Sequence, residues 1–293
     1  MTSGKGPDKK ALLALLSVIF IWALDFVGVE YCTAHMSIML IATVKLAMAG
    51  FVLLAFCCIK YKGIHIEKKD LIKIICIGAF VMGGYMNIES YGIGQISSPM
   101  ASLILAIVPV LGLLADRFLN GIKITGPKVA AIAGSIVGVA LLVMTTGEKL
   151  SGSAAGIFAV FVGAVLWAAY IILTKNFFEK YNLIQVMAVI MLSAAAFSLP
   201  LVFVFDKPVF MEPDPILFAV LIGTVLISTI AAEVLYAYSI SKLSVTIVSV
   251  AENVMPLVTV VFAWLLLGTT LNVYQIIGGL IIIASVMVIT VKE

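Results

Sequence analysis

Long runs of apolar residues fill nearly the whole chain, and short groups of Lys, Asp, Asn, Gly and Pro separate them. Each run has the roughly 20 residues that an α-helix needs to cross the hydrocarbon core of a bilayer. The residues between the runs mark helix ends. The pattern predicts an all-α polytopic membrane protein with ten transmembrane helices, at residues 11–31, 36–59, 71–91, 97–119, 127–146, 154–174, 183–204, 215–240, 243–267 and 271–291.

Composition strengthens this prediction. Hydrophobic residues make up 63% of the chain and charged residues only 11%, and the mean hydropathy is +1.23. A water-soluble domain uses about 45–50% apolar residues and could not bury this much apolar surface. The net charge of +3 is spread over short loops, so we expect a lipid bilayer and no nucleic acid as partner.

The positive charges indicate on which side of the membrane each loop lies. If the ten helices are correct, Lys149 and Lys207 alone lie on one side of the membrane, and Lys45 lies inside a helix. All other Lys and Arg residues then lie on the opposite side, together with both termini. Because cytoplasmic loops collect positive charge, we expect a multi-pass protein of the cell membrane, a prokaryotic inner membrane, with both termini cytoplasmic.

The chain contains an internal repeat. At an offset of 147 residues, five positions of the first half recur in the second, and two Trp residues recur at an offset of 145. The pairs are Tyr91/Tyr238, Ser97/Ser244, Ser102/Ser249, Pro109/Pro256, Gly121/Gly268 and Trp22/Trp167. We expect two repeats, 1–148 and 149–293. Because each holds five helices, an odd number, the second must be inverted in the membrane, as in many secondary transporters.

These repeated positions resemble a known family. The segments YGIGQISSPMASLILAIVPVLGLLADRFLNG and YSISKLSVTIVSVAENVMPLVTVVFAWLLLG, with a Trp in the first helix of each half, are similar to the EamA domain of the drug/metabolite transporter superfamily, ten-helix type. The likeness covers nearly the whole chain. It departs from the family at Ile122 and Thr269, where members often have Glu, and at Lys45, where many have Arg.

The resemblance implies a basket-shaped bundle whose central cavity is lined chiefly by the first, third, fourth, sixth, eighth and ninth helices. Members carry amino acids, amines, nucleotide sugars, choline or drugs, so the fold leaves the substrate open.

Ionisable residues inside the predicted helices are candidates for the site, because a charge at the bilayer centre costs about 2.5–3.5 kcal/mol. The carboxylates are Asp25, Glu89, Glu233 and Glu252. Asp25 either lines the cavity or pairs with Lys45 of the next helix, which would then have a structural role. Asp25 and Glu252 are the proton-coupling candidates. Asp116, beside Arg117 near a helix end, is expected to be hydrated and paired locally.

Aromatic side chains share these helices. Tyr85 lies one turn before Glu89, and Trp22 lies three residues before Asp25. The aromatic candidates for substrate binding are Trp22, Tyr85, Trp167, Tyr170 and Tyr236. Aromatic faces attract organic cations, although the same residues also serve packing and interfacial belts. Pro109 and Pro256 are expected to bend equivalent helices and to take part in gating.

Several classes of chemistry lack support. The chain has no phosphate-binding GxxxxGK[ST] motif, no HExxH and no GxSxG, so ATP-driven pumping and common hydrolytic reactions are not expected. His35 and His65 lack companions for a metal site. We expect no cofactor, no metal and no enzymatic activity.

The sequence therefore favours a secondary active transporter that works by alternating access on a small molecule. The excess of buried acids over Lys45 favours a cationic or zwitterionic amine or amino acid, with export favoured and proton coupling open. Alternatives are an uncoupled facilitator, a drug exporter and, from another class, an intramembrane lipid-modifying enzyme. The protein is expected to be a monomer or a homodimer.

Overall fold

The computed structural model describes residues 7–33, 35–145, 150–205, 214–267 and 272–292. The chain is almost entirely helical in these ranges. The elements of the first half are α1 (Lys9–Thr33), α2 (Ile38–Tyr61), α3 (Lys68–Cys76), η1 (Ile77–Met82), α4 (Gly83–Ile93), α5 (Ser98–Leu105), α6 (Val108–Leu119) and α7 (Gly126–Met144). Those of the second half are α8 (Ala154–Lys180), α9 (Leu183–Phe205), α10 (Pro215–Thr224), η2 (Val225–Ala231), α11 (Ala232–Lys242), α12 (Val245–Glu252), α13 (Met255–Leu267) and α14 (Val273–Lys292).

These elements form the ten spans that the hydropathy pattern predicted. Within the described ranges, nine helices are long and apolar enough to cross a membrane. The tenth is α1, whose 25 residues extend about 37 Å at 1.5 Å per residue. Four spans are composite: α3–η1–α4, α5–α6, α10–η2–α11 and α12–α13. The predicted all-α fold is confirmed.

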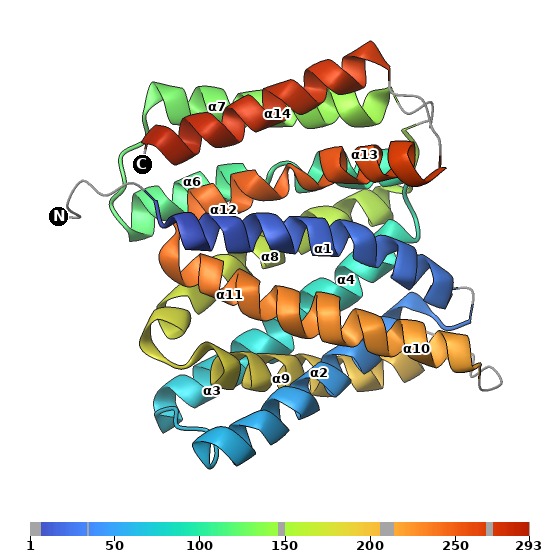
Figure 1. Ribbon diagram of the computed structural model, residues 1–293, viewed down its shortest axis with the longest axis vertical. Helices are drawn as coiled ribbons and strands as arrows, with labels where there is room; N and C mark the ends of the chain where they lie inside the picture. The colour runs from blue at the N-terminus through green and yellow to red at the C-terminus, as the bar shows by residue number, and fades with distance from the viewer. Residues whose placement is uncertain (1–6, 34, 146–149, 206–213, 268–271, 293) are drawn as a thin grey trace.

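The spans pack as two inverted five-helix repeats. The first span of each half lies against the third span of the other half, so that α1 packs on α11 and α8 packs on α4. The remaining pairs join equivalent spans, α2 with α9 and α7 with α14. Figure 1 shows the helices stacked in layers, with α7 and α14 at one edge and α2, α3 and α9 at the other. The start of α1 and the end of α14 lie at the same end of the bundle (Figure 1); we call it the termini end.

Local sequence explains where the helices begin. Ser37, Ser153 and Ser244 each accept a hydrogen bond from the backbone N–H three residues later, which satisfies one of the free donors at a helix start. Asp214 caps α10 by accepting from the backbone N–H of Ile216, two residues later. Proline opens α5, α6, α7 and α10, where its missing N–H costs nothing.

Small residues set the distance between α7 and α14. A Cβ atom added to Gly138 would come within 2.7 Å of the Gly278 carbonyl oxygen, and one added to Gly278 would come within 2.6 Å of the Gly138 carbonyl oxygen. Only glycine permits this close backbone contact. These glycines therefore pack helices of one chain together.

The fourth and ninth spans are interrupted rather than simply bent. The first breaks between α5 and α6 at residues 106–107, and the other between α12 and α13 at residues 253–254. Pro109 and Pro256 follow as early residues of α6 and α13, positions that tolerate a missing N–H. The predicted bends thus take the form of two matched helix breaks.

Candidate functional site

Five aromatic rings meet at the centre of the bundle, around Trp167 of α8. The Trp167 ring centroid lies 4.9 Å from that of Tyr85 on α4 and 5.3 Å from that of Tyr170 on α8. Tyr236 of α11 stacks on Trp167 at 5.5 Å. Trp22 of α1 contacts Trp167 at 5.9 Å and Tyr236 at 5.0 Å. The spacings are those of favourable aromatic pairs.

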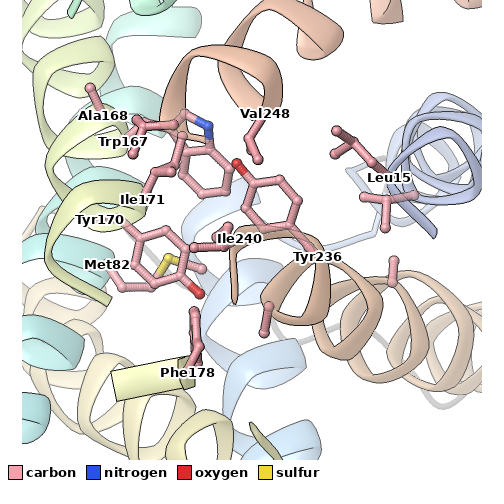
Figure 2. Close-up of a cluster of buried hydrophobic side chains, with 14 of the residues drawn as sticks. Leu15, Met82, Trp167, Ala168, Tyr170, Ile171, Phe178, Tyr236, Ile240 and Val248 are labelled. Atoms are coloured by element: carbon pink, nitrogen blue, oxygen red, sulfur yellow. The ribbon is translucent and has the colours of Figure 1, made fainter. Parts of the chain in front are cut away.

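Figure 2 shows Trp167, Tyr170 and Tyr236 converging from α8 and α11, with the Tyr236 hydroxyl directed toward Trp167. Trp167, Tyr170 and Tyr236 are buried. The aromatic residues predicted for the site are therefore brought together from spans of both repeats, and we call these five residues the aromatic cluster.

Glu252 lies beside the aromatic cluster at the last turn of α12, just before the helix break. The Trp167 Nε1 donates to both carboxylate oxygens at 3.1 Å, and the Tyr236 hydroxyl donates to Oε1. Hydrogen bonds to an ionised group are stronger than those between neutral groups. The two ring donors thus hold the carboxylate in one orientation.

Glu233, one helical turn from Tyr236 on α11, has a different environment. Its side chain is only 5% exposed, and its Oε2 has no hydrogen-bond partner among the described residues. Glu252 and Lys45 are the charged groups that act on it electrostatically. A buried polar atom without a partner costs about 1–3 kcal/mol, which suits a position that receives a ligand.

Glu89 of α4 is the third carboxylate near the rings. It follows Tyr85 by one turn and interacts with it electrostatically. Its backbone runs close to α8 at Gly163, where an added Cβ would lie 3.5 Å from the Glu89 Cβ. Among the described residues, Glu89, Glu233 and Glu252 form no ion pair.

Asp25 and Lys45 form a separate group. The Lys45 Nζ lies 2.7 Å from Asp25 Oδ2, and the Ser228 hydroxyl donates to Asp25 Oδ1 at 2.5 Å. Trp22 reaches the same segment, because its Nε1 donates to the Ser228 carbonyl oxygen at 3.2 Å. Of the two alternatives for Asp25, the structure has the ion pair with Lys45. Ser228 was missed because nothing in the sequence marks it.

Two π-helical turns precede the site residues. The segment η1 (Ile77–Met82) leads into Tyr85 and Glu89, and η2 (Val225–Ala231) leads into Glu233 and Tyr236. Each inserts extra backbone into an otherwise α-helical span, which shifts the face on which the following side chains appear, and such turns are frequent at functional sites. The sequence carried no recognisable signal for them.

The expectation for Asp116 was wrong. The residue is fully buried and has no ion pair with Arg117 among the described residues. Its Oδ2 accepts hydrogen bonds from the backbone N–H and hydroxyl of Thr246 at 2.8 and 2.7 Å. Asn120 donates to its Oδ1 at 2.8 Å. Asp116 was expected to be hydrated, but hydrogen-bond donors at the start of α12 take the place of water.

In the described parts of the chain, no three His, Cys, Asp or Glu side chains are grouped so as to hold a metal ion. The centre instead offers negative charge and ring faces. Carboxylates and aromatic faces together attract organic cations, and buried carboxylates at the interface of two inverted repeats are typical of secondary transporters.

The fold and the site thus define a polytopic membrane transporter. The family model of the EamA-like transporter family matches residues 9–144 and 154–291, and the chain belongs to that family. An uncharacterized transporter of Archaeoglobus fulgidus is 26% identical over 97% of this chain and 100% of its own length. A probable terminal-alkyne amino-acid exporter of Streptantibioticus cattleyicolor is 27% identical, over 96% of this chain and 93% of its own length.

A solved crystal structure superimposes with a TM-score of 0.82, at 17% identity over 96% of each chain. At that identity the likeness concerns the fold.

Proposed function

We propose that the protein is a secondary transporter that exports a cationic or zwitterionic amine or amino acid by alternating access. The observation that carries the proposal is the uncompensated negative charge at the centre. Lys45 is bound to Asp25, so Glu233 and Glu252 face the aromatic cluster without a cation of their own among the described residues.

The physical argument is one of electroneutrality. Two or three carboxylates in a low-dielectric site are too costly to remain ionised without compensation. A substrate ammonium group or a proton supplies the missing positive charge, and the ring faces add cation–π attraction to an organic cation. An anionic substrate would raise the cost instead.

We assign distinct tasks to the carboxylates. Glu233, with its unpartnered oxygen, receives the substrate ammonium group. Glu252, held by Trp167 and Tyr236, takes up the proton that exchanges with substrate. Asp25 was the other proton-coupling candidate, but Lys45 and Ser228 already compensate it. We place it in a structural role.

The moving units are the repeats 1–148 and 149–293, which rock about the central site. The helix breaks before Pro109 and Pro256 lie in the fourth and ninth spans, and these spans bend there when the repeats move. One chain supplies all the residues of the site, so a monomer suffices. The termini end, whose loops carry most of the Lys and Arg residues, faces the cytoplasm of a prokaryotic cell.

The amino-acid class also agrees with the printed name of the relative from Streptantibioticus cattleyicolor, a probable exporter of a terminal-alkyne amino acid. That name supports the substrate class and the direction. The aromatic cluster fills the centre with apolar ring surface, which suits an amine or amino acid with an apolar side chain.

A thermal-shift screen of the purified protein tests the substrate class, because a ligand that binds only the folded state raises the melting temperature. The panel holds apolar and basic amino acids, primary amines, quaternary ammonium compounds and nucleotide sugars. Stabilisation by amines or amino acids supports the proposal. Stabilisation by nucleotide sugars alone would refute it.

Transport is then measured in proteoliposomes with the stabilising compound. Uptake that follows an imposed pH gradient and is lost in Glu252→Gln supports proton exchange. Counterflow without any gradient, unchanged in Glu252→Gln, would establish the uncoupled facilitator instead. A product formed from lipid by the purified protein would favour the enzyme alternative.

A further inference from the structure

Two charged side chains hold the turn between α11 and α12 from opposite sides. On one side, the Lys175 Nζ of α8 donates to the carbonyl oxygens of Ile240 and Leu243, at 2.8 and 2.7 Å. On the other side, Asp116 of α6 accepts from the N–H and hydroxyl of Thr246, near the start of α12. We call Lys175 and Asp116 the turn clamp.

The signs of the two charges fit the helix ends that they contact. The last carbonyl groups of α11 carry partial negative charge, and the first N–H groups of α12 carry partial positive charge. A cation therefore meets the C-terminus and an anion meets the N-terminus. Asp116 is fully buried and the Lys175 side chain is only 17% exposed, so water screens neither contact well. Lys175 Nζ also lies 3.2 Å from Glu179 Oε1 on its own helix, and Glu179 is the more exposed partner of this pair.

The turn clamp lies at the termini end, where the fourth and ninth spans pack tightly against each other. The described residues of α12 from Val245 to Ala251 are all buried. A Cβ added to Gly112 of α6 would come within 2.5 Å of the Ser249 hydroxyl. At this end, α6 of the first repeat and α12 of the second leave no space between them.

The equivalent turn at the other end, between α4 and α5, lacks these charges. The position 147 residues after Asp116 is Ala263, and the position 145 residues before Lys175 is Glu30. Ala263 has no charge where the clamp has the negative Asp116, and Glu30 is acidic where the clamp has the positive Lys175. The described side chains from Met100 to Leu105 also remain partly exposed, apart from Ala101. Among the described residues, the α4–α5 turn is held by uncharged hydrogen bonds to Ser151 and Ser153, whereas the α11–α12 turn is held by two charged side chains.

We propose that Asp116 and Lys175 are positioning residues that hold the bundle closed at its termini end and must release the α11–α12 turn when this end opens. The inference rests on the proposed alternating access. It concerns α11 and α12 because these helices carry Glu233, Tyr236 and Glu252. Release of the turn would thus move the site residues at the same time as the closure opens.

The test measures access to Ser249, which is fully buried at this closure. Ser249→Cys is introduced after the four native cysteines are replaced by alanine, and the purified protein is treated with a membrane-impermeant maleimide. We expect slow labelling of the parent. Labelling should be about tenfold faster in Asp116→Ala and in Lys175→Met, the change that the loss of one charge-assisted hydrogen bond produces.

Arg117→Gln is the matched control, because it removes a charge from the exposed neighbour of Asp116 and should leave labelling unchanged. Thr246→Val removes the hydroxyl donor and keeps the backbone N–H, so it should give an intermediate rate. Equal labelling in Asp116→Ala and Arg117→Gln would overturn the proposal.

Circular dichroism and the melting temperature verify that each variant is folded. If Asp116→Ala does not fold, Asp116→Asn keeps an acceptor oxygen without the charge, and Lys175→Met tests the other half of the clamp. The labelling assay needs no substrate. Fast labelling in the clamp variants of a protein that transports nothing would therefore support the closure while refuting the proposed function.

Discussion

The acidic residues of the membrane-spanning helices differ in how their charge is balanced. Asp25 is paired with Lys45 at 2.7 Å and accepts a further hydrogen bond from Ser228. Glu252 and Glu233 form no ion pair among the described residues, and one oxygen of Glu233 has no hydrogen-bond partner. We call Asp25 and Lys45 the paired group, and the two glutamates the open group.

The difference suits a structural role for the paired group and a ligand-binding role for the open group. The paired group joins α1, α2 and η2 and is complete without a ligand. The open group adjoins the aromatic cluster, and in the proposed mechanism it is complete only when a substrate cation or a proton binds. The role of a charged residue inside a membrane protein therefore depends on its partners, since Asp25, Glu233 and Glu252 have two distinct environments.

Neutralising the open group should have the largest effect on transport. Glu233→Gln and Glu252→Gln keep the size of each side chain and remove the charge that binds the cation. Each loses a charge-assisted contact of about 1.5–3 kcal/mol, which corresponds to roughly a 10- to 100-fold loss of affinity. Titration of the substrate in a binding assay measures the change.

Glu67→Gln is the control for that experiment, because the Glu67 carboxylate is 70% exposed at the bundle end. Normal affinity in Glu233→Gln and Glu252→Gln, in folded protein, would remove the distinction between the open and the paired group.

Breaking the paired group should act on stability. Lys45→Met leaves the largely buried Asp25 without its cation, and loss of one partner of a fully buried pair costs roughly 3–5 kcal/mol, which is the upper limit here. Removing both charges, in Asp25→Asn with Lys45→Met, should restore much of this loss. Unfolding of the purified variants by denaturant measures the difference. A single Lys45→Met variant as stable as the parent would show that the pair fastens nothing.

Removing the indole donor should give a smaller change in the open group. Trp167→Phe keeps a ring next to Tyr236 and eliminates the Nε1–H that contacts both oxygens of Glu252. We expect affinity for the substrate to fall about tenfold. Trp264→Phe is the control, since Trp264 is 48% exposed on the bundle surface. Equal affinities in the two variants would mean that the indole donor does not support the site.

A change away from both groups should have the smallest effect on transport. Gly138→Ala places a Cβ 2.6 Å from Ile282 Cγ1, so α7 and α14 must move apart at a cost of about 1–3 kcal/mol. Because this pair lies at the edge of the bundle (Figure 1), we expect a lower melting temperature with unchanged substrate affinity. A matching loss of affinity would show that destabilisation alone explains the other variants.

The fold could be predicted from the sequence because the membrane imposes strong rules. A span requires about 20 apolar residues, and positive loops alternate with the others. The 147-residue offset of Pro109 and Pro256 then identified the repeat. The π-helical turns η1 and η2 were missed because they depend on how neighbouring helices pack and have no local sequence code.

For the candidate site, the sequence indicated which residues gather better than it indicated how they are arranged. Trp22, Tyr85, Trp167, Tyr170 and Tyr236 do meet, since equivalent spans of inverted repeats converge at the centre. The tasks of Glu252 and Asp25 could not be separated in advance, because the decisive partners Ser228 and Tyr236 come from distant segments. Asp116 was misjudged for the same reason: its partner Thr246 lies 130 residues away.

Proton release on substrate binding tests the central claim most directly. The purified protein, in weakly buffered solution with a pH-indicator dye, is mixed with the compound of the thermal-shift panel that stabilises it most. The account predicts that a cationic or zwitterionic compound displaces protons, that Glu252→Gln abolishes the release, and that Asp25→Asn with Lys45→Met retains it. Release that persists in Glu252→Gln and disappears in the paired-group variant would contradict the account.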